Sequence, residues 1–242
     1  MKGSYKARGV VLHTVKYGDS GVVAYLYTDR SGRQTYLVQG VRSARSKGNK
    51  AALFQPLFLL EYEGIEPKHG EMHRMKDVVA AVPLSSIPFD ARKSAIALFM
   101  AETLYRLVRE SEANPHLFSF IEQTVHALDV LEEGVANFHL WFLVKLSYFL
   151  GFYPGNSYSA GNYFDIVRGE FVPLPPGHRI AMQREEAELL GRLMEVPIEQ
   201  LGGIGLNRRQ RVDFLNALLA FIGYHADTIR VVRSIDILKE VF

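Results

Sequence analysis

The spacing of apolar residues changes near Pro83, and this change constrains the fold more than any other feature of the chain. Before it, apolar and polar residues alternate, as in Gln34–Gln39, which is typical of strands with one buried face. Beyond it, apolar residues recur at helical spacing, as Ile96, Met100 and Leu104 do. The sequence therefore predicts an α+β protein with a β domain first and a helical domain second.

The β domain is expected to span residues 1–82 and to form a small closed barrel. Its segments are short, rich in Val, Leu, Tyr and Phe, and separated by turn residues. Closing five such strands into a barrel leaves no exposed sheet edge. The predicted strands are Tyr5–Val15, Val22–Thr28, Gln34–Val41, Leu53–Glu63 and Glu71–Val82.

The helical domain is expected to span residues 83–242, with an insert at 152–180 that is rich in Pro and Gly. Within the insert, Tyr163–Val167 and Glu170–Val172 flank a Gly and predict a two-stranded hairpin. The predicted helices are Ala91–Glu110, one that begins at Asn114-Pro115, Ala136–Leu150, Arg184–Met194, Asn207–Gly223 and Ile229–Phe242.

Signatures of enzymes are missing from the sequence. It contains no G-x-x-x-x-G-K-[ST] phosphate loop and no H-E-x-x-H metal motif. It also has no cysteine, so disulfides, thiol nucleophiles and thiolate metal sites are excluded. We therefore expect a protein that is not an enzyme and that needs no cofactor and no metal.

No apolar stretch approaches the roughly 18 residues of a transmembrane helix. The apolar run near the N-terminus is also too short for a signal peptide. We expect a cytoplasmic protein with no membrane partner.

Positive charge concentrates in the first third of the chain. Residues 1–80 hold 13 Lys and Arg against 7 Asp and Glu, although the net charge of the whole chain is only +2. Four of these cations lie in the run Gly40–Lys50 (GVRSARSKGNK), whose Gly and Ser content predicts an exposed loop. Such a loop suits phosphate groups, although a charge run can also be simply a solvated surface.

Aromatic residues are interleaved with the cations of this first third. Single-strand-binding barrels combine basic grooves with aromatic rings on which bases stack. The tyrosines are Tyr5, Tyr17, Tyr25, Tyr27 and Tyr36. The alternative is that some of them fill the barrel, because the residues of a strand point alternately in and out.

A second basic cluster lies near the C-terminus. Arg208, Arg209 and Arg211 occupy a predicted helix start, and Arg230 and Arg233 follow. Cations oppose the dipole at a helix N-terminus, so helix stability does not explain them. They are either solvated or paired with nearby acids, or they bind an acidic partner.

Several segments along the chain carry a family resemblance: Gly9–Ser20 (GVVLHTVKYGDS), Gly40–Arg42, Leu53–Leu57 (LFQPL), Leu107–Glu110 (LVRE), Phe142–Leu146 (FLVKL) and Leu150–Pro154 (LGFYP). Through them the chain resembles the RecO family of bacterial recombination mediators. The resemblance implies an OB-fold barrel followed by a helical domain with a small insert. Many family members carry a four-cysteine zinc module in that insert, which this chain lacks. We expect no zinc here, and packing of Tyr158, Tyr163, Phe164 and Phe171 instead.

The resemblance implies a role in DNA repair and homologous recombination. Such a protein binds single- and double-stranded DNA, anneals complementary strands and helps to load recombinase on DNA coated by SSB. Its expected partners are RecR and the acidic C-terminal tail of SSB, and its expected location is the cytoplasm, at the nucleoid. The alternatives are an OB-fold protein for RNA and a non-catalytic adaptor between proteins.

The predicted site residues are all cations. For DNA phosphates they are Arg42, Arg45, Lys47 and Lys50, with Lys6, Arg8 and Arg33 as further candidates. For the SSB tail they are Arg208, Arg209, Arg230 and Arg233, chosen for their charge and position alone.

Overall fold

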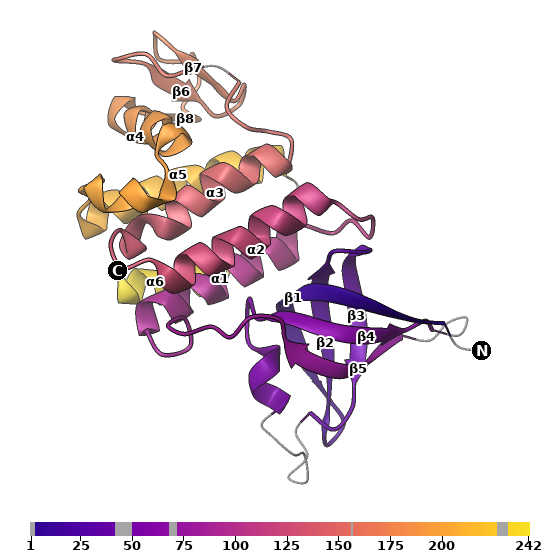
Figure 1. Ribbon diagram of the computed structural model, residues 1–242. Coiled ribbons are helices and arrows are strands. Elements are labelled where there is room, and N and C mark those ends of the chain that lie inside the picture. Colours follow the sequence, from indigo (N-terminus) through magenta and orange to yellow (C-terminus); the bar gives the residue numbers. More distant parts are fainter. Residues whose placement is uncertain (1–2, 42–49, 68–71, 156, 227–231) are drawn as a thin grey trace. The chain divides into compact units, whose positions relative to one another are not determined.

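A computed structural model describes residues 3–41, 50–67, 72–155, 157–226 and 232–242 (Figure 1). The chain forms two compact units, Met1–Asp129 and Val130–Phe242. The first unit therefore contains the predicted β domain together with the helices that follow it. The boundary predicted after residue 82 stays a prediction.

The first unit begins with a closed five-stranded barrel, as the sequence predicts, with the strand order β1-β2-β3-β5-β4. Neighbouring strands are antiparallel except for β3 and β5, whose parallel pairing closes the barrel. The strands are β1 (Ser4–Tyr17), β2 (Gly21–Thr28), β3 (Gly32–Val38), β4 (Leu59–Ile65) and β5 (His73–Ala80).

Alternate residues of each strand fill the barrel. Ala24 and Leu26 of β2 are completely buried in the core cluster, and Leu60 of β4 joins them. Two buried tyrosines share this interior, where the Tyr62 hydroxyl donates to the Tyr36 hydroxyl at 2.9 Å. Burial, together with the neighbouring Tyr62, raises the pKa of Tyr36, so its hydroxyl stays neutral.

The predicted strand Leu53–Glu63 was wrong in its first half. Residues Lys50–Phe54 form a 3₁₀ helix, η1, and β4 begins only at Leu59. Leu57, between them, has φ of 63° and its N–H donates to Val11 O at 2.8 Å. This left-handed conformation is uncommon for a non-glycine residue and ends any extended run.

Two helices complete the first unit, α1 (Ala91–Leu107) and α2 (Pro115–Val130). The predicted end of the first helix at Glu110 was too late by three residues, because Val108 is already extended. The Glu110 carbonyl instead accepts the N–H of Arg33 at 2.9 Å. Gly32, with φ of 56°, lets the β2–β3 turn approach this segment closely, where a Cβ would lie 2.6 Å from Glu110 O.

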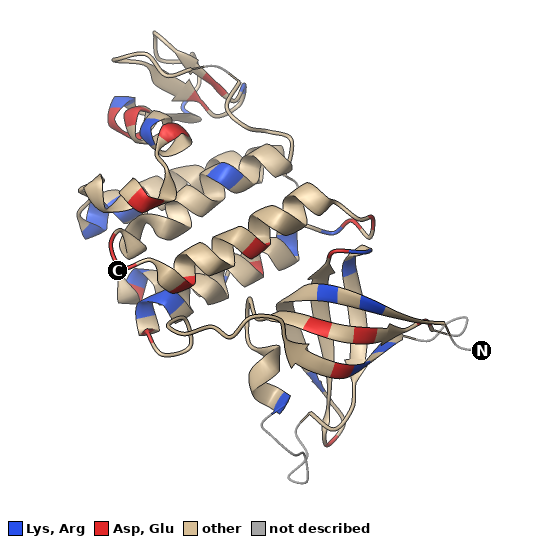
Figure 2. Ribbon diagram, in the orientation of Figure 1, with Lys and Arg blue, Asp and Glu red and all other residues tan. Residues whose placement is uncertain are grey.

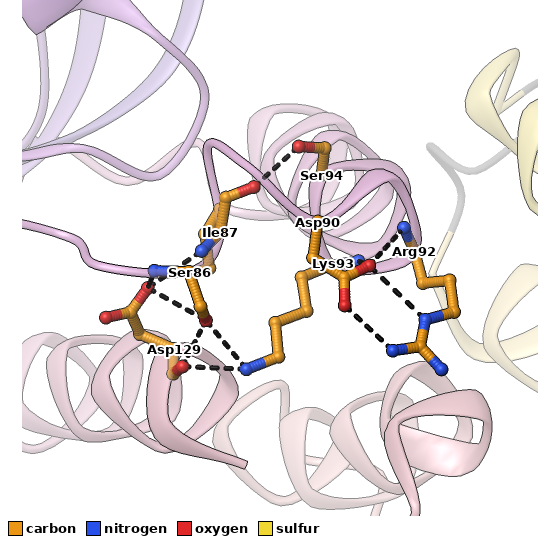
Figure 3. Close-up of polar contacts among 7 residues, drawn as sticks. All are labelled: Ser86, Ile87, Asp90, Arg92, Lys93, Ser94 and Asp129. Carbon is orange, nitrogen blue, oxygen red and sulfur yellow. Dashed lines mark hydrogen bonds and ion pairs between the residues drawn. The ribbon is translucent and has the colours of Figure 1, made fainter. Parts of the chain in front are cut away.

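A buried polar cluster ties the connector after β5 to the end of α2 (Figure 3). The Asp129 carboxylate accepts the N–H groups of Ser85, Ser86 and Ile87 at 2.8–2.9 Å. The Lys93 ammonium donates to the Asp129 carbonyl and to the Ser86 hydroxyl, both at 2.7 Å. The cluster therefore links α1, α2 and the connector in one network.

Thr103 in α1 is completely buried, and its hydroxyl has no hydrogen-bond partner among the described residues. We expect Thr103→Val to raise the free energy of unfolding by about 1 kcal/mol, because it removes an unsatisfied polar group at nearly constant volume. Chemical denaturation measures this. The matched control is Thr124→Val, which should lower stability because the Thr124 hydroxyl donates to Phe120 O at 2.7 Å. A destabilised Thr103→Val would contradict the expectation.

The second unit contains four helices in its described part, all foreseen in the sequence. The last begins at Ser234, whereas the prediction began at Ile229; residues 229–231 lie outside the described part of the chain. The helices are α3 (Phe138–Phe149), α4 (Arg184–Glu195), α5 (Arg208–His225) and α6 (Ser234–Val241). Two further 3₁₀ helices are η2 (Val135–Asn137) and η3 (Ile198–Gly203).

The insert and the two residues that follow it form a three-stranded sheet in the order β7-β6-β8. The predicted hairpin is present as β6 (Tyr163–Asp165) and β7 (Glu170–Val172), and β8 (Ala181–Met182) adds a short third strand. Phe164 and Phe171 are buried with ring centroids 5.0 Å apart, and Tyr158 lies 5.6 Å from Phe171. Aromatic packing therefore holds this sheet, while Tyr163 lies against the Arg184 guanidinium instead.

Candidate nucleic-acid interface

The cationic loop predicted from the sequence lies between two residues of the barrel core. Val41 and Phe54 are both buried in the core cluster, at 3% and 6% exposure. Of the four predicted phosphate ligands, Lys50 is exposed at the start of η1. Arg42, Arg45 and Lys47 lie outside the described residues. The barrel core therefore holds Val41 and Phe54, the residues that we call the stems of the loop, in place.

Arg8 and Lys6 lie on β1 among carboxylates. Arg8 Nη1 is 2.7 Å from Glu122 Oε1, and Arg8 Nε is 3.6 Å from Asp29 Oδ2. Lys6 pairs in register with Glu63 of β4. Arg8 already has two acidic partners, which compete with any phosphate, so its DNA contact stays a prediction.

Arg33 on β3 is held by two tyrosines. Its guanidinium lies 4.5 Å from the ring centroid of Tyr105 and 5.6 Å from that of Tyr25. Arg33 Nη1 also donates to the Tyr105 carbonyl at 2.9 Å. Cation–π contacts of this kind join β2 and β3 to α1, so Arg33 has a structural role besides the predicted one.

One side of the barrel, formed by β1, β4 and β5, is rich in acids. Figure 2 shows acidic segments on β4 and β5 beside basic segments on β1. An open groove of about 500 Å³ lies along it. Four carboxylates against two cations make this side unfavourable for phosphates. The charged lining residues are Lys6, Arg8, Asp29, Glu61, Glu63 and Asp77.

The tyrosines of the barrel differ widely in how much of each is exposed to solvent. Tyr27 and Tyr36 are 1% exposed, and the Tyr5 hydroxyl is 3.1 Å from that of Tyr36. Tyr25 packs its ring at 5.1 Å from Tyr105. Tyr17, near the tip of the β1–β2 hairpin, is 51% exposed. The alternative that some tyrosines fill the barrel therefore holds for Tyr5 and Tyr36, whereas Tyr25 and Tyr27 lie outside the core cluster.

Arg74 of β5 is a surface cation that the sequence did not single out. It pairs with Leu37 of β3 through the parallel ladder and with Ile65 of β4. Local sequence carries no signal for this placement, because the β3–β5 pairing joins segments far apart in the chain.

The predicted cations of the second unit lie at the ends of α5 and α6. Asn207 and Gln210 form a capping box that starts α5 in spite of its cations. Arg208 donates to the Lys239 carbonyl, and exposed Arg209 lies 3.6 Å from Asp213. Arg233 precedes α6. Arg230 lies outside the described residues.

Arg211, which the prediction left out, is the half-buried member of this cluster. Its Nη2 donates to Leu206 O at 2.9 Å and its Nη1 to Phe242 O at 3.4 Å. Burial lowers the pKa of Arg211, and burial together with Arg211 lowers that of neighbouring His139 to about 3. His139 is therefore neutral at pH 7.

The described residues contain neither a metal-binding cluster nor a membrane-spanning helix. No three His, Asp or Glu side chains among them converge as a metal ion requires. No helix in the described ranges has both the length and the apolar character needed to cross a membrane.

Known proteins resemble this chain over nearly its whole length. Residues 1–82 match the family described as "Recombination protein O N terminal", and residues 88–231 match "Recombination protein O C terminal". Similar proteins named DNA repair protein RecO come from Bacteroides fragilis, 39% identical, and Phocaeicola vulgatus, 36% identical. A third, from Flavobacterium psychrophilum, is 32% identical. Each alignment covers 98% of both chains.

Proposed function

This chain belongs to the RecO family of DNA repair and recombination proteins, and from that membership we propose that it binds single- and double-stranded DNA and anneals complementary strands. It also helps to load recombinase on DNA coated by SSB. The proposal assigns the chain no catalytic step. Its place of action is the chromosomal DNA of the cytoplasm.

The observation that carries the proposal is the cationic loop, whose stems Val41 and Phe54 are anchored in the barrel core. Annealing brings two phosphate backbones together, and cations offset their repulsion by releasing bound counterions. Contacts from such cations to phosphates position a protein on DNA without reading the base sequence.

A strand-annealing assay on complementary oligonucleotides coated by SSB tests the proposal. We expect the purified chain to accelerate duplex formation without ATP. A rate equal to that of SSB-coated strands alone would contradict it. Competition between single-stranded DNA and RNA of equal length tests the alternative of an RNA-binding protein, and an absence of DNA binding at low salt would favour the adaptor alternative.

The proposed protein partners are RecR and the acidic C-terminal tail of SSB. For the tail we propose the cations Arg208, Arg209, Arg230 and Arg233 of the second unit. Support comes from their charge and from the exposure of Arg208 and Arg209, the second of which also pairs with Asp213.

Reversing the charge at all four arginines is expected to weaken binding of an SSB tail peptide at least tenfold, because each change replaces attraction by repulsion. Fluorescence anisotropy of the labelled peptide measures this. The matched control reverses Arg109, Arg168, Arg179 and Arg192, which are exposed cations elsewhere. If peptide affinity survives the first set, the tail binds at another surface.

A further inference from the structure

One row of residues crosses the outside of the barrel over four strands. Val15 of β1 pairs with Val23 of β2, Val23 pairs with Leu37 of β3, and Leu37 pairs with Arg74 of β5. Their sequence neighbours Val22, Val38 and Met75 lie in the core, so the row itself faces outward. Tyr17 extends the same face of β1 toward the hairpin tip. We call Val15, Tyr17, Val23, Leu37 and Arg74 the open face.

Helix α1 covers the neighbouring rows but not this one. Tyr27, in the row furthest from the tip, is 1% exposed, and Tyr25, in the next row, packs against Tyr105 of α1. In contrast, Val15 is 46% exposed. Among the described residues of β1, β2 and β3, apolar surface is therefore exposed toward the hairpin tip.

Tyr17 is the barrel tyrosine whose ring is most available to a ligand. Its ring lies over Gly21, where a Cβ would be 3.6 Å from Tyr17 Cδ1. No aromatic or cationic side chain of the described residues stacks on it, and half of the residue is exposed. Gly21 thus gives the ring a backbone floor and leaves its opposite side open.

The charge of the open face suits a polyanion. The face contains Arg74 and no acid. Lys16, between Val15 and Tyr17, pairs in register with Val22 of the core and so lies on the opposite side of the strand. Asp19, in the turn that follows β1, is the acid closest in sequence to Tyr17. The other side of the barrel carries the four carboxylates described above. The cationic run Gly40–Lys50 begins three residues after Leu37 in the sequence.

We propose that the open face binds single-stranded DNA, with one base stacked on the Tyr17 ring and a phosphate contacted by Arg74. This proposal rests on the proposed DNA binding and adds to it a base-stacking platform and a path for the strand. Stacking needs an unpaired base, so the face selects single strands over duplexes.

The test compares Tyr17→Ala with the wild-type chain in binding oligothymidylate and a duplex of equal length. We expect Tyr17→Ala to weaken single-strand binding roughly 5- to 100-fold, the loss typical of one stacked base, with an unchanged dependence on salt. Duplex affinity should stay within twofold. Tyr17→Phe should retain wild-type affinity, because stacking needs the ring and not the hydroxyl.

Arg74→Ala separates charge from stacking, since it should reduce the slope of log K against log[salt] by about 0.7 for single strands. The matched control is Tyr148→Ala in the second unit, another exposed tyrosine at 65%, which should change nothing. If Tyr17→Ala binds oligothymidylate as the wild type does, the open face is not the platform, although the DNA-binding proposal stands. If the wild type itself fails to bind, both proposals fail.

Discussion

Replacing Arg42, Arg45, Lys47 and Lys50 together with alanine should lower the slope of log K against log[salt] for duplex DNA by about 3.6. Each lost phosphate contact contributes about 0.9 to that slope on B-DNA, and about 0.7 on single strands. Affinity should fall by orders of magnitude near physiological salt. Titrations at four or more salt concentrations measure both quantities. Because Val41 and Phe54 anchor the stems in the core, we expect the barrel to remain folded.

The control for this variant must remove the same charge elsewhere. Alanine at Arg109, Arg168, Arg179 and Arg192 changes the net charge equally but leaves the loop intact. We expect its slope to change far less. Equal slopes for the wild type and the loop variant would refute the loop as the phosphate-binding element.

Asp129→Asn is expected to lower the free energy of unfolding by about 2–4 kcal/mol. The Asp129 carboxylate uses both oxygens to accept N–H groups, Oδ1 from Ser86 and Ile87 and Oδ2 from Ser85. An amide NH₂ in place of either oxygen would face a donor, and unsatisfied buried donors cost about 1–3 kcal/mol each. Urea denaturation measures the change.

Asp90→Asn is the matched control for this variant. Asp90 caps α1 by accepting the N–H of Arg92 at 2.8 Å (Figure 3). Asparagine caps a helix as well as aspartate does, so stability should change by less than about 0.5 kcal/mol. If Asp129→Asn changed stability as little as this control, the buried cluster would not hold the first unit together.

The contribution of Asp129 to the free energy of unfolding should also depend on pH. Burial by itself raises the pKa of the carboxyl group, but the N–H groups of Ile87, Ser85 and Ser86 outweigh burial and lower it to about 2. A depressed folded-state pKa stabilises the fold above the unfolded value of about 3.9. This contribution should therefore disappear as the pH falls from about 4 to about 2, and the wild type should approach Asp129→Asn there.

The sequence predicted the order of elements well because its apolar spacing changes once, near Pro83. It failed at Leu53–Phe58, where an apolar run resembles a strand but forms η1 and a turn with Leu57 at positive φ. That conformation depends on the hydrogen bond from Leu57 N to Val11 O, a contact between distant segments. The end of α1 was missed for the same reason, since Glu110 O bonds to Arg33 N.

The candidate site was less predictable than the fold. Charge identified the cationic loop, but composition could not reveal that Arg8 and Arg33 have intramolecular partners. Five tyrosines looked alike in the sequence, and only long-range packing distinguishes exposed Tyr17 from buried Tyr27 and Tyr36. Arg74 became visible only through the parallel pairing of β3 with β5.

The cover that α1 and α2 provide for the barrel has a consequence for synthesis on the ribosome. The last strand of the barrel ends at Ala80, but the partners of Arg8 and Arg33 on the helices, Glu122 and Tyr105, are made later. During that interval the barrel face with Tyr27 lacks its helical cover. Transiently exposed apolar surface promotes aggregation, so we expect nascent chains that stall between Ala80 and Glu122 to depend on chaperones.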